Sequence, residues 1–184
     1  MNDWILHTKI EKNSIKQIKN EIDNLSENCI SLDERSTRGI NSTQYILTHK
    51  KDKMTISQSI IIKKVKECIE ENVELNVENA WTVLGKENSY HLVHKHHNKK
   101  KQISVVVYLS LPKKNNLHQS GAFYCFLKKN EQINYLAIQP ELGSIFIFPS
   151  NVLHGSYPQS KGLRQTLNFD FSYNFINNKT SDNA

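Results

Sequence analysis

Histidines are concentrated in one short segment of the chain. Four of the eight histidines lie within seven residues: His91, His94, His96 and His97. Successive side chains on a β-strand point to opposite faces, so His94 and His96 would share a face on a strand. Two neutral imidazoles on one face can hold a divalent ion such as Fe(II) or Zn(II). A solvated, histidine-rich edge strand has the same spacing, so this motif alone leaves both interpretations open.

A second segment delivers one more histidine at the end of an apolar run. Residues 143–154 read GSIFIFPSNVLH, which predicts a buried strand, a proline turn and then His154. Another alternating segment begins ten residues later. One face of this last strand would be polar, with Arg164, Thr166, Asn168 and Asp170, and the other apolar, with Leu167, Phe169, Phe171 and Tyr173. We expect helices on the apolar face and a polar pocket inside a barrel on the other.

Arg164 needs an anionic partner in such a pocket, because an unpaired buried charge is costly. Two partners are open: Asp170 on the same strand, or the carboxylate of a ligand, which a guanidinium binds in bidentate fashion. Arginine is scarce here. The chain has 21 lysines and three arginines, Arg35, Arg38 and Arg164. A single arginine therefore carries more information than a single lysine.

Together these motifs predict a metal site above an anion site. Two histidines come from an early strand and His154 from a late one, so three imidazoles could reach one metal at the mouth of a jelly roll. Arg164 would lie further down the barrel. A five-carbon keto dicarboxylate could bridge the two, with its keto-acid end on the metal and its far carboxylate on Arg164.

These segments resemble the 2-oxoglutarate–Fe(II) oxygenase superfamily, in particular viral and bacterial members related to prolyl hydroxylases. The resemblance covers residues 37–174. The segments that carry it are 37–42 (TRGINS), Ala80-Trp81 followed by Gly85, His94-Lys95-His96, 103–109 (ISVVVYL), and 143–154 with Arg164. The last of these is the most specific.

The resemblance implies an Fe(II)- and 2-oxoglutarate-dependent dioxygenase that uses O₂ to hydroxylate a small-molecule or peptide substrate. It implies that His94, His96 and His154 bind iron, with no catalytic residue beyond these ligands. Arg164 would bind the distal carboxylate of 2-oxoglutarate, Thr166 would support it, and Tyr108 would reach the cosubstrate. The candidate substrate contacts are Trp81, Arg38 and Asn168.

The proposed ligand set departs from the superfamily at its second position. The usual second ligand is Asp or Glu, but position 96 is histidine, and no acidic residue occurs between His91 and Ser104. Three neutral ligands donate less negative charge to iron. A shift to His97 is the alternative, although a Lys95/His97 pair would place a cation beside the metal.

Helical and strand-like patterns divide the chain. Apolar residues recur at helical spacing near 14–25, with Ser14 as a candidate cap, and over 55–71. Residues 3–9 form a short candidate strand, and 26–54 look irregular. The strands expected after residue 76 lie near 80–84, 91–97, 102–110, 121–128, 133–139, 144–148, 154–158 and 164–173.

This order predicts a mainly β protein with N-terminal helices, built as a double-stranded β-helix of the jelly-roll or cupin type. A plain β-sandwich is the structural alternative. We expect a single domain over 1–184. Within it, 1–75 would be helical support with a segment able to cover the pocket, 76–174 the jelly-roll catalytic core, and 175–184 a disordered tail.

Composition separates the remaining alternatives. The net charge is +6, but the arginine-rich stripes with aromatics expected of a nucleic-acid binder are missing. Three isolated cysteines and no long apolar stretch favour a cytoplasmic protein without a membrane segment. A three-histidine cupin-type enzyme without 2-oxoglutarate explains the histidines but leaves Arg164 and Thr166 without a role. A non-catalytic jelly-roll binding module leaves all of them without one.

Overall fold

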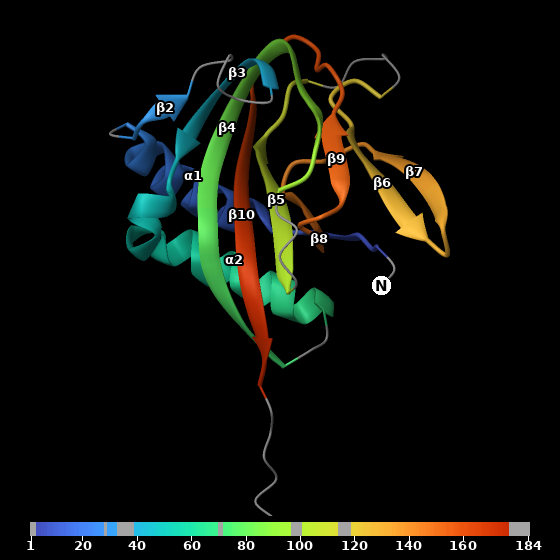
Figure 1. Cartoon of the computed structure of the whole chain (residues 1–184). Helices are drawn as coiled ribbons and strands as arrows, with labels where there is room; N and C mark the ends of the chain where they lie inside the picture. Colours follow the sequence, from blue (N-terminus) through green and yellow to red (C-terminus); the bar gives the residue numbers. More distant parts are fainter. Residues whose placement is uncertain are drawn as a thin grey trace, which may run out of the picture.

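A curled antiparallel sheet forms most of the molecule (Figure 1). The computed structural model describes residues 3–27, 29–32, 39–69, 72–96, 101–113 and 119–176. The main path of the sheet runs in the order β1-β8-β5-β10-β4-β9-β6-β7, and β3 pairs with β4 beside it. The strands are β1 (Leu6–Lys9), β2 (Ser31–Leu32), β3 (Gly39–Ile46), β4 (Val73–His94), β5 (Gln102–Ser110), β6 (Phe123–Lys129), β7 (Gln132–Ile138), β8 (Ser144–Pro149), β9 (Leu153–Ser156) and β10 (Arg164–Phe175).

Two amphipathic helices cover one face of this sheet. They are α1 (Lys12–Ser26) and α2 (Thr55–Ile69), and the short 3₁₀ helix η1 (Thr48–Lys53) precedes α2. The apolar positions predicted for this face are buried: Ile15, Ile18 and Ile22 on α1, and Ile61 and Val65 on α2. They share a core cluster with Leu167, Phe169 and Phe171 of β10, as the alternation predicts.

The central strands are buried on both faces because the sheet curls around a second, smaller apolar cluster. On β8, Ile145 and Ile147 join the helix-side core, whereas Phe146 and Phe148 point to the inner side. The inner cluster consists of Val106, Tyr108, Phe123, Cys125, Phe146, Phe148 and Val152. It fills only part of the interior. The rest of the inner face of β10 is polar.

The strand β4 connects the two halves of the sheet. Over Val73–Gly85 it pairs with β10, and its last residues, His91 and His94, pair instead with β9. The sequence pattern predicted two strands in this region, near 80–84 and 91–97. The structure has one strand, Val73–His94, which continues through residues 85–90 although Asn88 adopts a left-handed conformation with a φ of 62°.

Other local predictions are wrong. The described residues of the range 26–54 are mostly regular and form β2, β3 and η1. Strand β3 escaped prediction because one of its faces borders the polar interior, which weakens its apolar alternation. Helix α1 begins at Lys12, and Glu11 rather than Ser14 occupies the cap position, without a side-chain hydrogen bond.

Several predictions fall outside the described residues. These concern Arg38, His97 and most of the predicted tail, residues 177–184. Of the two tail residues that are described, Phe175 is not disordered but ends β10.

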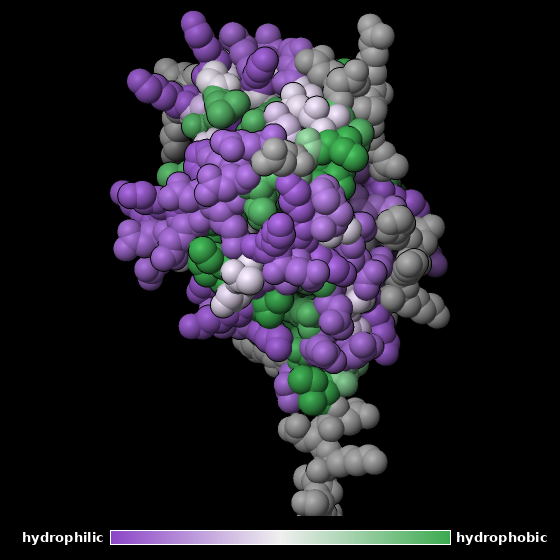
Figure 2. Space-filling model, turned by 90° about the vertical axis from the view of Figure 1, so that its left-hand side faces the viewer, coloured by the Kyte–Doolittle hydropathy of each residue, from purple (hydrophilic) through white to green (hydrophobic). Residues whose placement is uncertain are grey.

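The face that carries the helices is mostly hydrophilic (Figure 2). Hydrophobic residues appear there as small, separate areas between polar side chains. This arrangement agrees with the amphipathic helices, whose apolar sides pack against the core. Among the described residues, no helix has the length and apolarity needed to cross a bilayer.

Candidate metal and cosubstrate site

Three histidines converge at the open end of the curled sheet. His94 ends β4 and lies opposite His154 of β9 in the strand pairing. His96 follows β4 by two residues, and its backbone N–H donates to the carbonyl of Ser150 at 3.0 Å. One ligand atom from each imidazole lies within 4.8 Å of the other two. The spacing of two proposed for His94 and His96 thus brings both to one point, although His96 lies beyond the strand itself.

A bulge in β4 turns a fourth histidine toward the same cavity. The register pairs His91 with Ser156 but His94 with His154, so three residue steps on β4 oppose two on β9. Without the extra residue, side chains three positions apart would face opposite sides of the strand. His91 and His94 instead both line the cavity. The bulge explains why the sequence pattern alone missed His91.

Each of the three clustered histidines has its Nδ1 engaged by an oxygen. Nδ1 of His94 lies 2.7 Å from the carbonyl oxygen of Leu92, and Nδ1 of His154 lies 2.9 Å from that of Val152. A carbonyl can only accept, so Nδ1 of each ring carries the proton. Nε2 of each ring then carries no proton, and this is the form in which an imidazole binds a metal.

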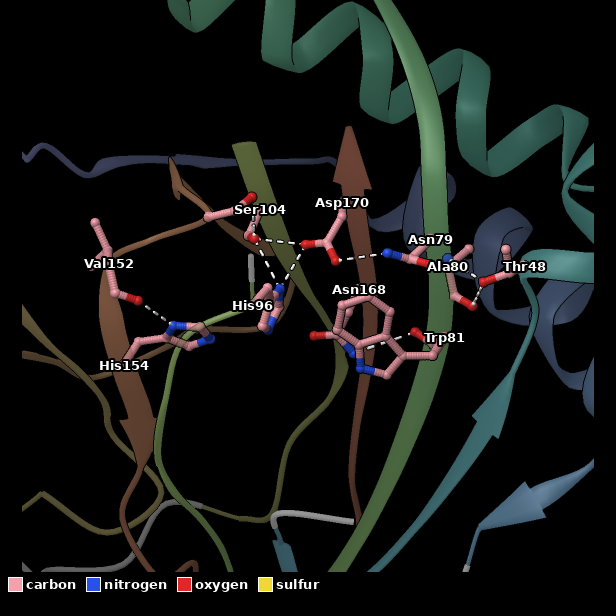
Figure 3. A network of polar contacts seen from close by, with 11 residues as sticks. Thr48, Asn79, Ala80, Trp81, His96, Ser104, Val152, His154, Asn168 and Asp170 are labelled. Atoms are coloured by element: carbon pink, nitrogen blue, oxygen red, sulfur yellow. Dashed lines mark hydrogen bonds and ion pairs between the residues drawn. The ribbon is translucent and has the colours of Figure 1, made fainter. Parts of the chain in front are cut away.

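His96 has a different and charged partner. Its Nδ1 lies 2.6 Å from Oδ1 of Asp170 on β10 (Figure 3). Ser104 of β5 joins this contact, with its Oγ 2.7 Å from the same carboxylate oxygen and 3.0 Å from the imidazole nitrogen. Asn79 donates to Oδ2 of Asp170 at 3.3 Å. Burial would raise the pKa of Asp170, but its hydrogen bond and charge interaction with His96 and the hydrogen bonds from Ser104 and Asn79 outweigh burial and lower the pKa. The ionised carboxylate is therefore favoured.

Burial keeps two of the site's histidines neutral. It lowers the pKa of His154 well below its usual value, and the neighbouring histidines lower it further. Burial also lowers the pKa of His91 to about 3, with Arg164 as the next cause. Neutral imidazoles can coordinate a cation at neutral pH, whereas imidazolium cannot. The donor set therefore fits a divalent metal.

Arg164 lies deeper in the same cavity. It is buried, with Nη2 3.4 Å from Oγ of Ser89, and its Nη1 has no hydrogen-bond partner among the described residues. The internal ion pair with Asp170 does not form, since Asp170 contacts His96, Ser104 and Asn79 instead. A buried guanidinium with an unused donor matches a site for an anionic ligand.

Four other predicted residues line this cavity. Tyr108 lies opposite Thr166 in the pairing of β5 with β10. Burial raises the pKa of Tyr108 to about 12, so its phenol remains neutral and can donate a hydrogen bond. Asn168 donates to Oγ1 of Thr166 at 3.1 Å and to the carbonyl of Trp81 at 3.3 Å. The ring of Trp81 stands edge-on to His96, with centroids 5.2 Å apart.

The cavity that holds these groups has a volume of about 390 Å³. Small-molecule sites are on the order of 300–1,000 Å³, so it can hold a compact ligand. Gln44 and Ile46 of β3 contribute to its wall. Of the residues that line it, the sequence pattern did not single out His91 or the β3 side chains, and it assigned Asp170 only as an alternative partner for Arg164.

Comparison with known proteins agrees with this architecture. The family model described as "Putative 2OG-Fe(II) oxygenase" matches residues 79–170, half of the chain. No curated protein sequence matches.

Solved structures of three oxygenase-type enzymes share the fold. A 2OG-Fe(II) oxygenase family protein from Burkholderia pseudomallei aligns with a TM-score of 0.65 and 12% identity, covering 91% of this chain and 84% of its own. A prolyl-4-hydroxylase from Pseudomonas putida aligns at 0.62 and 13%, covering 91% of both chains. The α-ketoglutarate-dependent epimerase SnoN of nogalamycin biosynthesis aligns at 0.70 and 10%, covering 97% of this chain and 83% of its own.

These matches confirm the predicted mainly β fold with N-terminal helices, a double-stranded β-helix. The family match covers the histidine pair, His154 and Arg164. The chain belongs to the 2OG-Fe(II) oxygenase family of enzymes.

Proposed function

We propose that this protein is an Fe(II)- and 2-oxoglutarate-dependent dioxygenase that hydroxylates a small-molecule or peptide substrate. The observation that carries the proposal is one cavity with two kinds of site. At its mouth lie three imidazoles whose ligand atoms are within 4.8 Å of one another, and inside lies a buried guanidinium with an unused donor. His94, His96 and His154 would hold Fe(II), and Arg164 would hold the distal carboxylate of 2-oxoglutarate.

Bound iron and 2-oxoglutarate would supply the oxidative chemistry: O₂ is consumed, 2-oxoglutarate becomes succinate and CO₂, and a substrate C–H bond becomes C–OH. The chain positions these partners. Thr166 and Tyr108 lie beside Arg164, where their hydroxyl groups could hydrogen-bond the carboxylate. Inner apolar residues such as Phe123 and Val106 line the cavity and limit water.

The substrate would approach from the side of Trp81 and Asn168, which line the cavity near His96. Arg38, the third predicted substrate contact, remains a prediction from the sequence. The related folds include a prolyl-4-hydroxylase and an epimerase.

A cytoplasmic location is also proposed. Cys29, Cys68 and Cys125 are all free thiols, as expected in a reducing compartment.

The decisive test is an anaerobic titration of the Fe(II)-loaded protein with 2-oxoglutarate, followed by its weak visible charge-transfer band. We expect a saturable band in the wild type. Arg164→Ala should bind Fe(II) as before but weaken 2-oxoglutarate binding by roughly 30-fold or more, because losing one partner of a buried charge pair costs about 2–5 kcal/mol. The exposed neighbour Lys161→Ala should match the wild type.

Three results would reject all or part of this assignment. Wild-type protein that binds iron but gives no band would favour the three-histidine cupin-type enzyme that does not use 2-oxoglutarate. Failure to bind any iron would favour the non-catalytic binding module. A band with unchanged affinity in Arg164→Ala would show that another residue binds the cosubstrate.

A further inference from the structure

We propose that Asp170 is a positioning residue that supplies, through His96, the negative charge that a carboxylate ligand supplies directly in two-histidine-one-carboxylate iron sites. The inference rests on the metal site of the proposed function and deepens it. It addresses the feature in which this chain departs from such sites, namely histidine at position 96.

The contact with Asp170 fixes the orientation of the His96 ring. Nδ1 of His96 donates to Oδ1 of Asp170 at 2.6 Å, and the Ser104 hydroxyl donates to the same oxygen at 2.7 Å. With Nδ1 turned to Asp170, Nε2 is the nitrogen of His96 left to coordinate a metal. Asp170 would therefore present this imidazole to the metal through Nε2.

His96 differs in this respect from the other two histidines. His94 and His154 donate to the carbonyl groups of Leu92 and Val152, two residues earlier in each case. Those acceptors are neutral and local. The partner of His96 is charged and lies 74 positions away in the sequence. A carboxylate behind an imidazole raises the basicity of its other nitrogen, so His96 would be the strongest donor of the three.

The carboxylate of Asp170 is held by three partners, His96, Asn79 and Ser104, so its position is fixed. Asn79 of β4 and Ser104 of β5 fix it from either side of β10 (Figure 3). The side chains of Asp170 and His96 are 4% and 11% exposed, which keeps their interaction poorly screened by water. A metal on Nε2 would polarise the His96 ring and strengthen the contact.

The charge balance then equals that of the usual site. A divalent ion with three neutral imidazoles keeps a charge of +2, and one carboxylate behind His96 lowers the total to +1. A ligand carboxylate gives the same total. The difference is that the charge acts across the ring, so all three ligand positions remain imidazole nitrogens.

The test compares Asp170→Asn with the wild type, using Co(II) as the probe and a competing chelator to measure affinity. Asparagine has the same shape and can still accept from Nδ1, but it removes the charge. We expect Co(II) binding to weaken about 10–100-fold, the usual effect of losing such a partner. The Fe(III)/Fe(II) potential should also rise. Ser172→Ala, two residues along β10 with its hydroxyl on Glu78, is the matched control and should change neither quantity.

A second comparison guards against a variant that fails to fold. His96→Asp alone places two carboxylates in contact, whereas His96→Asp with Asp170→Asn keeps one. The double variant should bind Co(II) more tightly than the single variant. Wild-type affinity and potential in Asp170→Asn, or a double variant no tighter than the single one, would overturn the inference. Co(II) binding that follows these expectations without any 2-oxoglutarate band would instead reject only the proposed function.

Discussion

At the scale of single residues, the site depends on keeping imidazoles neutral inside the protein. His91 shows this most clearly, because burial lowers its pKa to about 3 and its Nε2 has no hydrogen-bond partner among the described residues. In the unfolded chain its pKa is about 6.5. Between these two values the unfolded chain binds more protons than the folded protein. Acidification below about pH 6.5 therefore destabilises the metal-free fold.

This argument predicts the behaviour of His91→Phe. When the pH falls from 7.5 to 5.5, His91 gains a proton in the unfolded chain but not in the folded protein. This difference should lower the free energy of unfolding by about 1.4 kcal/mol, the free energy that corresponds to one pKa unit. Over the same pH interval, the free energy of unfolding of the variant should therefore decrease by about 1.4 kcal/mol less than that of the wild type, whatever the stability of the variant at pH 7.5. Urea unfolding of metal-free protein at the two pH values measures the difference.

The exposed His49 provides the control for this experiment. His49→Ala should show the same pH dependence as the wild type. An unchanged pH dependence in His91→Phe would mean that His91 accepts a proton in the folded protein.

At the scale of elements, a set of hydrogen bonds to Glu21 connects the two helices, α1 and α2. The Glu21 carboxylate of α1 accepts from the backbone N–H groups of Ile56 and Ser57, at 2.9 and 2.8 Å, and also contacts the Ser57 hydroxyl. These N–H groups belong to the first turn of α2 and have no partner within the helix. Glu21 thus acts as a cap supplied from another element, and its charge complements the helix dipole.

Removing this cap should destabilise the protein. We expect Glu21→Ala to lower the free energy of unfolding by about 1–2 kcal/mol, measured by urea denaturation. Glu67→Ala on α2 removes only an exposed pair with Lys64 and should have no measurable effect. Equal effects from the two variants would show that Glu21 contributes as an ordinary surface charge.

At the scale of the whole molecule, the proposed metal site links segments that are far apart in the sequence. His94 and His96 come from the end of β4, and His154 comes from β9. The supporting Asp170 comes from β10. The unfolded chain holds no such arrangement, so a metal that binds here stabilises the fold by mass action.

Metal addition should therefore raise the stability of the protein, and the increase should depend on the histidines that bind the metal. At a free Co(II) concentration of 100 times its Kd, the free energy of unfolding should increase by about 2.7 kcal/mol, and a chelator should reverse the gain. His154→Ala should abolish the gain, whereas His49→Ala should keep it. Urea unfolding with and without Co(II) measures both, and a full gain in His154→Ala would place the metal elsewhere.

Much of this molecule follows from local patterns in the sequence. Period-two segments gave nearly every strand of the second half, and helical spacing placed α1 and α2, because each pattern reports which side chains one element buries. The alternation along β10 separated a helix-packing face from a polar one, as the structure confirms. The same local logic brought forward His94, His96, His154 and Arg164 as one group.

Tertiary structure alone decided the rest, because it depends on which distant segments become neighbours. The bulge that turns His91 inward exists only in the pairing of β4 with β9. The partner of Arg164 was open between Asp170 and a ligand until the fold placed Asp170 2.6 Å from His96. Strand β3 has too polar a pattern to predict, since its inner face borders a cavity instead of a core. Residue types and spacings thus determined which groups could do chemistry, and the packing of strands determined which of them meet.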